Sequence, residues 1–98
     1  MILEFDSEVF RWDARPDAVW FLTSVPLELS GDIREIPRPH RGFGAVRVRV
    51  SVGGSEWSTS IFPSSDGTYA LPLKKAVMKA ESLDEGGPVH VRLHILDG

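Results

Sequence analysis

The sequence contains no cysteine, and this absence narrows the chemistry before any pattern is considered. Disulfide bonds, thiolate catalysis and cysteine-ligated zinc are excluded. Long hydrophobic runs are also missing, since the longest apolar stretches fall well short of the roughly 20 residues that a membrane helix needs. The start, MILEFDSEVF, lacks the basic and then apolar segments of a signal peptide. We therefore expect a cytoplasmic protein without a membrane segment.

Positive charge is not in excess, because the formal net charge is -3. This balance argues against gross, nonspecific attraction to nucleic acid or anionic lipid. The charges are nevertheless segregated along the chain. Residues 36–55 contain no acid, whereas the first 13 residues contain four acids and one arginine. A local basic surface is therefore compatible with the acidic total.

Alternating hydrophobic and polar residues predict most of the secondary structure. In the first strand the alternation slips after Val9, because Phe10 and Trp12 fall on the polar side. We expect a bulge or sharp coil that returns both side chains to the core. The run at 18–25 is apolar on both sides, which predicts a central strand covered on both faces. Strands are expected at residues 2–12, 18–25, 45–52, 55–62, 68–71 and 88–96.

Two prolines mark abrupt changes from strand to helix. In TYALPLKKAVMKA, residues 68–80, Pro72 lacks the N–H that a further ladder bond would need, but its φ suits a first helical turn. We expect a strand that ends at Leu71 and a helix that begins at Pro72. Pro26 is expected to act in the same way after the strand at 18–25. PRPHRGFG, residues 37–44, is predicted to be a loop.

The order strand, proline, amphipathic helix, glycine turn, strand occurs twice in the chain. The first copy runs from Ala18 to Val52 and the second from Tyr69 to Leu96. The 98 residues suffice for one compact domain, which we place at residues 1–98. These patterns predict an all-β (mainly β) fold. We expect a small, closed, split β-barrel with an internal pseudo-two-fold, whose two short helices cap opposite ends.

The second copy resembles the signature of AbrB-type swapped-hairpin transcription regulators. The matching residues are Gly67, Leu71, Pro72, Val77, Leu83 and Gly86. Gly87 stands where that family usually has Asp, so the customary side-chain cap of the turn is missing.

Nearly the whole chain resembles the bacterial family called domain of unknown function 1905. The residues that carry this likeness are Trp20-Phe21, Val25-Pro26, Gly44 with VRVRV, WSTSIFP at 57–63, Gly67, Tyr69, LPLKKA at 71–76 and Val89-His90-Val91. The resemblance implies a small split β-barrel related to the regulator type. It implies no mechanism, because the family has no established activity.

Nucleic-acid or anion binding is the sharpest hypothesis for a site. Arg38, His40 and Arg41 fall in the predicted loop, and Arg47 and Arg49 share one face of the following strand. Guanidinium groups spaced along a β-ribbon can contact phosphates. The alternative is that the outer face of a barrel strand carries charge for solubility. Phe43, in a glycine-flanked part of the same loop, is a candidate exposed contact.

The other candidate residues favour structural roles. His90 and His94 are about 13 Å apart on one strand, so both cannot bind one metal ion, and we predict no metal and no cofactor. Glu4, Asp6 and Glu8 share a strand face, which is typical of an edge protected from pairing. No nucleophile motif occurs. Core packing is the favoured role of the large aromatic residues Trp12, Trp20, Trp57, Phe62 and Tyr69.

These observations favour a noncatalytic binding or interaction module. The sequence does not identify its partner: a protein or a second copy of the chain is expected before nucleic acid, and exposed valine-rich strand edges could pair between chains. The first alternative is an AbrB-like DNA-binding protein that uses the basic segment from Arg38 to Arg49. The second is a small-ligand binder or enzyme that uses the barrel mouth. Binding to a membrane is not expected.

Overall fold

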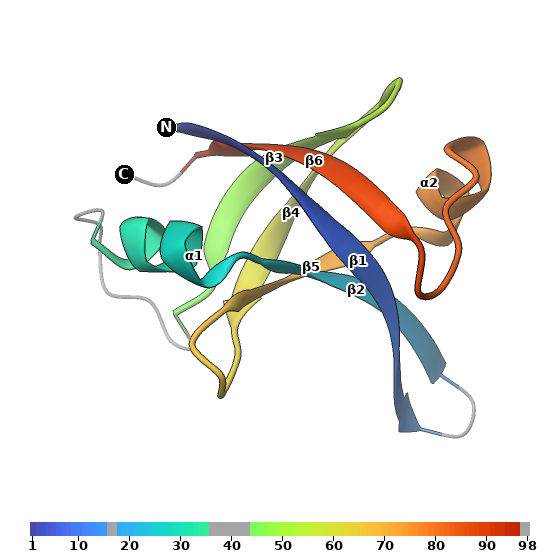
Figure 1. The fold of residues 1–98 in the computed structure, drawn as a ribbon, viewed down its shortest axis with the longest axis horizontal. Helices are drawn as coiled ribbons and strands as arrows, with labels where there is room; N and C mark the ends of the chain where they lie inside the picture. Colours follow the sequence, from blue (N-terminus) through green and yellow to red (C-terminus); the bar gives the residue numbers. More distant parts are fainter. Residues whose placement is uncertain (16–17, 36–43, 97–98) are drawn as a thin grey trace.

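The computed structural model describes residues 1–15, 18–35 and 44–96, and these form a closed antiparallel β-barrel (Figure 1). The strands follow each other around the barrel in the order β1-β2-β5-β4-β3-β6. The prediction of a mainly β, closed barrel with two short helices is confirmed. The elements are β1 (Ile2–Arg15), β2 (Ala18–Val25), α1 (Leu27–Arg34), β3 (Val46–Val52), β4 (Ser55–Pro63), β5 (Tyr69–Leu73), α2 (Lys75–Ala80) and β6 (Pro88–Ile95).

The strand order carries a two-fold relation. Exchanging β1 with β4, β2 with β5 and β3 with β6 leaves every strand pairing of the barrel in place. The same exchange maps α1, which connects β2 to β3, onto α2, which connects β5 to β6. Figure 1 shows the two helices on opposite sides of the barrel. The topology thus agrees with the repeated order of strand, proline, helix, glycine turn and strand in the sequence.

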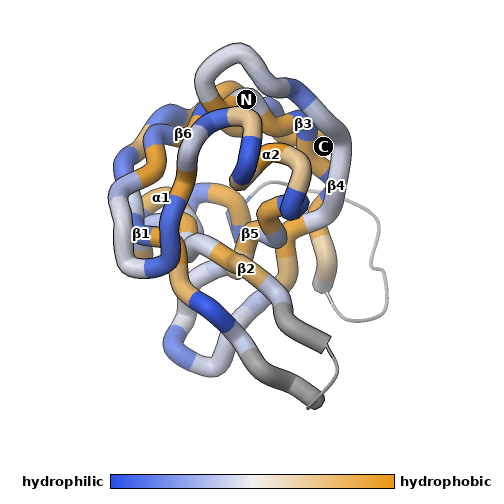
Figure 2. Tube along the Cα trace, turned by 90° about the vertical axis from the view of Figure 1, so that its right-hand side faces the viewer, coloured by the Kyte–Doolittle hydropathy of each residue, from blue (hydrophilic) through white to orange (hydrophobic). Residues whose placement is uncertain are grey.

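Inward-pointing side chains from all six strands fill the barrel interior. Along β3 and β6 the apolar positions are buried and the intervening positions mostly face solvent, and Figure 2 shows this alternation of hydropathy. Residues 48–51 of β3 pair with β4 on one side and with β6 on the other, so no free strand edge occurs at these positions. The buried residues on the two strands are Val46, Val48, Val50, Val52, Val89, Val91, Leu93 and Ile95.

Pro72 corrects one sequence prediction. It lies inside β5, opposite Leu22 of β2, and α2 begins only at Lys75, after Lys74 at its N-cap. A proline can stay in a ladder where its nitrogen points away from the paired strand. Among the described residues, β4 is in register with β5 only at Tyr69 and Ala70. Pro72 therefore lies where β5 has a partner on one side, and the missing N–H breaks no ladder bond.

Pro26 acts as predicted, since β2 ends at Val25 and α1 begins at Leu27. Pro26 itself is the N-cap, and its carbonyl accepts the first helical bond from the Ser30 N–H at 2.9 Å. The two prolines thus lie differently with respect to their strands. Pro26 ends a strand directly, whereas Pro72 is followed by two further residues before helix α2.

Helix α2 ends in a Schellman turn that contains a strained serine. Ser82 has φ 54°, in the left-handed region that favours glycine. The N–H of Leu83 donates to the carbonyl of Met78 at 2.8 Å, and the N–H of Ser82 donates to the carbonyl of Lys79 at 3.3 Å. This bond pair requires the left-handed residue at position 82.

Ser82→Gly is therefore expected to raise the free energy of unfolding by about 0.5–1 kcal/mol, because glycine adopts positive φ without a Cβ clash. Urea unfolding of the two proteins measures the difference. Ser65→Gly is the control: Ser65 is an exposed turn residue outside the positive-φ region, where glycine adds only unfolded-chain entropy. Equal effects of the two changes would contradict the assignment of strain to Ser82.

Candidate functional site: an aromatic face

Large apolar side chains collect on the outside of the barrel, on the side formed by β1, β2, β5 and β4. We call this surface the aromatic face. It lines a shallow groove of about 580 Å³, together with Pro63, Ser64, Ser65 and Ala70. The residues that define the aromatic face are Phe10, Trp12, Trp20, Leu22, Phe62 and Pro72.

The strand register explains why these side chains meet. Phe10 lies opposite Leu22, and Leu22 lies opposite Pro72 on its other side. Two further opposed pairs lie beside these residues. Trp12 of β1 lies opposite Trp20 of β2, and Phe62 of β4 lies opposite Ala70 of β5. Side chains at opposed positions have Cβ atoms roughly 5 Å apart and point to the same side of the sheet. The Phe10–Leu22–Pro72 row crosses three strands, and Phe62 on β4 adjoins it through Ala70, two residues before Pro72 on β5.

Two core predictions fail at this face. Trp12 is 55% exposed, Trp20 50%, Phe62 45% and Phe10 39%, so these four aromatics are not part of the core. Of the aromatic residues assigned to the core, only Trp57 and Tyr69 are buried.

The expected bulge that would turn Phe10 and Trp12 inward is absent between Val9 and Asp13, where the β1–β2 register is regular. The outer face of β2 carries Trp20 and Leu22 in the groove, so this strand is not covered on both sides as predicted. The sequence signal that could have revealed the site is the slip of alternation after Val9. Phe10 and Trp12 fall at positions that alternation assigns to the outer face of the strand, and they are exposed there.

The tryptophan pair lies on a projecting part of the barrel wall. The β2–β5 pairing ends with Phe21 opposite Leu73, so Trp12 and Trp20 lie on β1 and β2 beyond the end of β5. Figure 1 shows these two strands extending away from the barrel. Both indoles are therefore presented to solvent at one end of the groove.

The predicted basic segment is only partly described. Arg38, His40, Arg41 and Phe43 lie outside the described residues. Arg47 and Arg49 are exposed on the outer face of β3, as the alternation predicts. Strand pairing adds two residues that the sequence analysis did not connect with them, because His94 lies opposite Arg49 and Arg92 lies opposite Ser51.

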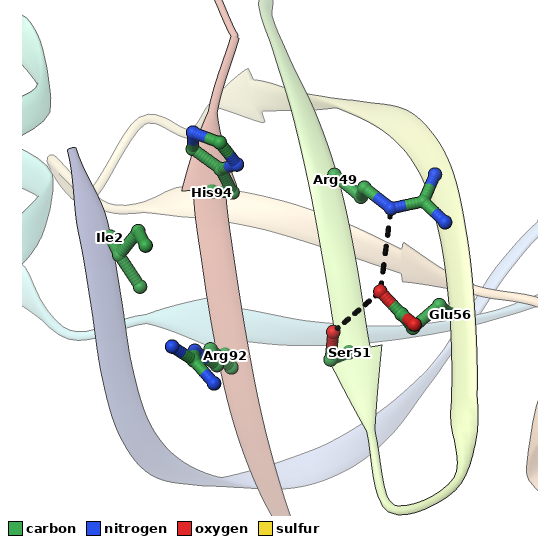
Figure 3. A pocket seen from close by; sticks show the side chains of 6 residues that line it. All are labelled: Ile2, Arg49, Ser51, Glu56, Arg92 and His94. Atoms are coloured by element: carbon green, nitrogen blue, oxygen red, sulfur yellow. Dashed lines mark hydrogen bonds and ion pairs between the residues drawn. The ribbon is translucent and has the colours of Figure 1, made fainter.

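Carboxylates compensate much of this basic surface. Arg49 Nε lies 3.4 Å from Glu56 Oε1, which also accepts a bond from Ser51, as Figure 3 shows. Arg92 Nε lies 3.8 Å from Glu4 Oε1. A pocket of about 190 Å³ between these groups is lined by Ile2, Arg49, Ser51, Glu56, Arg92 and His94. Its mixed charge does not favour a polyanion at this position.

The acidic face of β1 lies on the half of the strand that is in register with β6: residues 2–8 pair with β6, and the β2 register begins only at Val9. Among the described residues, Glu4 and Asp6 also contact His90 across the strands: Asp6 Oδ1 lies 2.8 Å from His90 Nδ1, and Glu4 Oε2 lies 3.3 Å from His90 Nε2. The three side chains are an exposed cross-strand charge cluster.

Hydrogen bonds to Asp6 and Glu4 raise the pKa of His90 above its usual value of 6.5. We therefore expect its NMR titration midpoint to lie above 6.5, and Asp6→Asn to lower it more than Glu4→Gln does. Because the folded-state pKa is the higher one, the protonated contact stabilises the fold below pH 6.5. This contribution disappears as the pH rises through the folded-state pKa. Glu85→Gln, an exposed acid on another segment, is the control and should leave the midpoint unchanged.

Two features are absent from the described residues. In those parts of the chain, no group of three or more His, Cys, Asp or Glu residues is arranged to hold a metal ion. No helix among them has the length and apolar character to cross a membrane.

The fold and its surface define a class: a small, closed, six-stranded barrel with a filled interior and an apolar groove on its outer wall. A family model described as Domain of unknown function (DUF1905) matches residues 5–93. The chain belongs to this family, as its motifs indicated. A search of the curated proteins found no match. The more distant likeness to AbrB-type regulators stays a prediction.

Proposed function

We propose that this protein is a noncatalytic binding module that contacts its partner through the aromatic face. The observation that carries the proposal is the set of four exposed aromatic side chains, on three strands, that line one groove. Apolar patches on a monomer surface expose hydrophobic area to water at a cost in free energy, and such patches mark interaction sites. Tryptophan is also one of the residue types enriched at the energetic centres of interfaces.

The chemistry of the groove supports binding rather than catalysis. Its described lining contains two serines, Ser64 and Ser65, but no histidine, carboxylate or lysine that could activate them. The alternative of a site inside the barrel mouth has little support, because side chains from all six strands fill the interior. Duplex DNA binding through the Arg38–Arg49 segment is also less favoured, since Glu56 compensates Arg49.

The three tryptophans provide a direct test by ¹⁵N NMR. Each has one indole N–H signal: Trp12 and Trp20 report on the aromatic face, and the buried Trp57 is the internal control. The protein would be titrated with four probes: single-stranded oligonucleotide, proline-rich peptide, oligosaccharide, and the protein itself over a range of concentrations. The proposal predicts that one probe shifts the Trp12 and Trp20 signals and leaves Trp57 in place. No shift of either signal with any probe at millimolar concentration would overturn it.

A further inference from the structure

The aromatic groove continues into a polar site at its β4 end. Phe62 lines the aromatic groove and also a second hollow of about 470 Å³, whose other lining residues are Arg47, Ser58, Thr59 and Ser60. The register explains this neighbourhood: Ser60 lies two residues before Phe62 on the outer face of β4, opposite Arg47 of β3. The two hollows therefore meet at one aromatic ring.

The combined surface has an unusual composition for this protein. It offers flat aromatic rings on β1, β2 and β4, then hydroxyl groups, then a guanidinium group, and no carboxylate among its described lining residues. The other described hollows do contain acids: Glu56 lines the pocket of Figure 3, and Asp84 and Glu85 line the one beside α2. The acid-free surface is thus complementary to a ligand that combines planar apolar groups with negative charge.

We propose that this surface binds single-stranded nucleic acid, an inference that rests on the proposed function of the aromatic face. Bases would stack on Trp12, Trp20, Phe10 and Phe62, and the backbone phosphates would contact Arg47 and the hydroxyls of Ser58 and Ser60. Aromatic platforms next to a basic track are the usual means of binding single strands without strict sequence preference. Followed around the curved barrel wall from β1 through β2, β5 and β4 to β3, the path crosses four inter-strand spacings, about 19 Å, which accommodates several nucleotides. A duplex does not fit this chemistry, because its bases are stacked and hidden from the rings.

The acidic total charge does not oppose this placement. Glu4 and Asp6 contact His90 on the outer face of β1 and β6, and Glu56 contacts Arg49. Few cations lie at the proposed site, so stacking supplies most of the affinity. A shallow salt dependence follows: with Arg47 as the contributing charge, affinity should fall by roughly 2.6-fold between 50 and 200 mM salt.

The test measures fluorescence anisotropy of labelled oligothymidylate and oligouridylate of about 12 nucleotides. We expect Trp20→Thr and Phe62→Thr each to weaken binding by about tenfold or more. Arg47→Gln should reduce the slope of log affinity against log salt by about 0.7. Arg92→Gln, on the mixed-charge pocket of Figure 3, is the matched control and should bind like the parent protein. Thermal unfolding verifies that each variant is folded, and Phe62→Thr keeps the test valid if Trp20→Thr weakens the projecting strands.

Three results would overturn this inference. One is no binding of either oligonucleotide at low salt. Another is binding that Arg92→Gln weakens but Trp20→Thr and Phe62→Thr do not, and a third is tighter binding of duplex than of single strands. In each case the NMR titration separates this failure from that of the proposed function. If the proline-rich peptide, the oligosaccharide or a second copy of the chain shifts the Trp12 and Trp20 signals instead, the aromatic face is a binding site for that partner.

Discussion

Replacing Leu71 with alanine is expected to lower the free energy of unfolding by about 2–5 kcal/mol. Leu71 lies at the centre of β5, is fully buried, and stands opposite Thr23 of β2. The change removes three buried carbon atoms and leaves a cavity that the surrounding strands fill only in part. A domain of this size has a total stability of about 5–15 kcal/mol, so the loss is a large fraction of it.

Urea unfolding followed by circular dichroism measures this loss as a lower midpoint at an unchanged slope. Leu27→Ala is the matched control, because Leu27 is 60% exposed on the first turn of α1. It should change stability by less than about 1 kcal/mol. Similar effects of the two substitutions would show that position 71 does not belong to the core of the barrel.

Replacing Ser30 with alanine is expected to cost about 1–3 kcal/mol, although it removes a single oxygen atom. Ser30 is a fully buried polar residue of α1. Its hydroxyl donates to the carbonyl of Val25 at 3.0 Å and accepts from the N–H of Tyr69 at 3.1 Å. Val25 and Tyr69 are themselves paired across β2 and β5, so one side chain fastens the helix to the end of this strand pair.

The specific readout is amide hydrogen exchange at Tyr69. Ser30→Ala should increase the exchange rate of this amide more than it increases the exchange rates of buried amides in β3 and β6. Ser65→Ala, at an exposed turn position, is the control and should change neither stability nor exchange. A stability change below about 0.5 kcal/mol for Ser30→Ala, with unchanged exchange at Tyr69, would contradict the role assigned to the hydroxyl. This outcome would mean that α1 is held by hydrophobic packing through Ile33.

The proposed binding surface explains an otherwise unfavourable feature of the fold. Trp12 and Trp20 are half-exposed at opposed positions of a projecting pair of strands, and opposed aromatic residues stabilise a strand pair by up to about 1 kcal/mol. That role does not extend to Phe62, which lies two strands away from Trp20 and is not opposed to another aromatic residue. The coincidence of all three rings on one groove is therefore better explained by a shared ligand.

The sequence by itself determined the class of fold and most of its elements. Period-two alternation in VRVRVSV and VHVRLHI specifies strands with one apolar face, and the repeated strand, proline and helix order specifies the two matched halves. These signals are local, because strand alternation and the backbone limits of proline depend on neighbouring residues alone. They also explain why Pro26 was placed correctly.

Only the tertiary structure decided which apolar side chains face inward and which strands lie side by side. Pro72 stays in its strand because β4 leaves one side of β5 without a partner at that point, a fact of barrel closure that no local pattern contains. The aromatic face likewise arises from pairing between β1, β2, β5 and β4, which brings together residues as far apart in the chain as Phe10 and Phe62. Removing an apolar side chain from water is favourable in free energy, but strand register determines whether that side chain lies in the core or on the outer face, where the proposed partner would cover it.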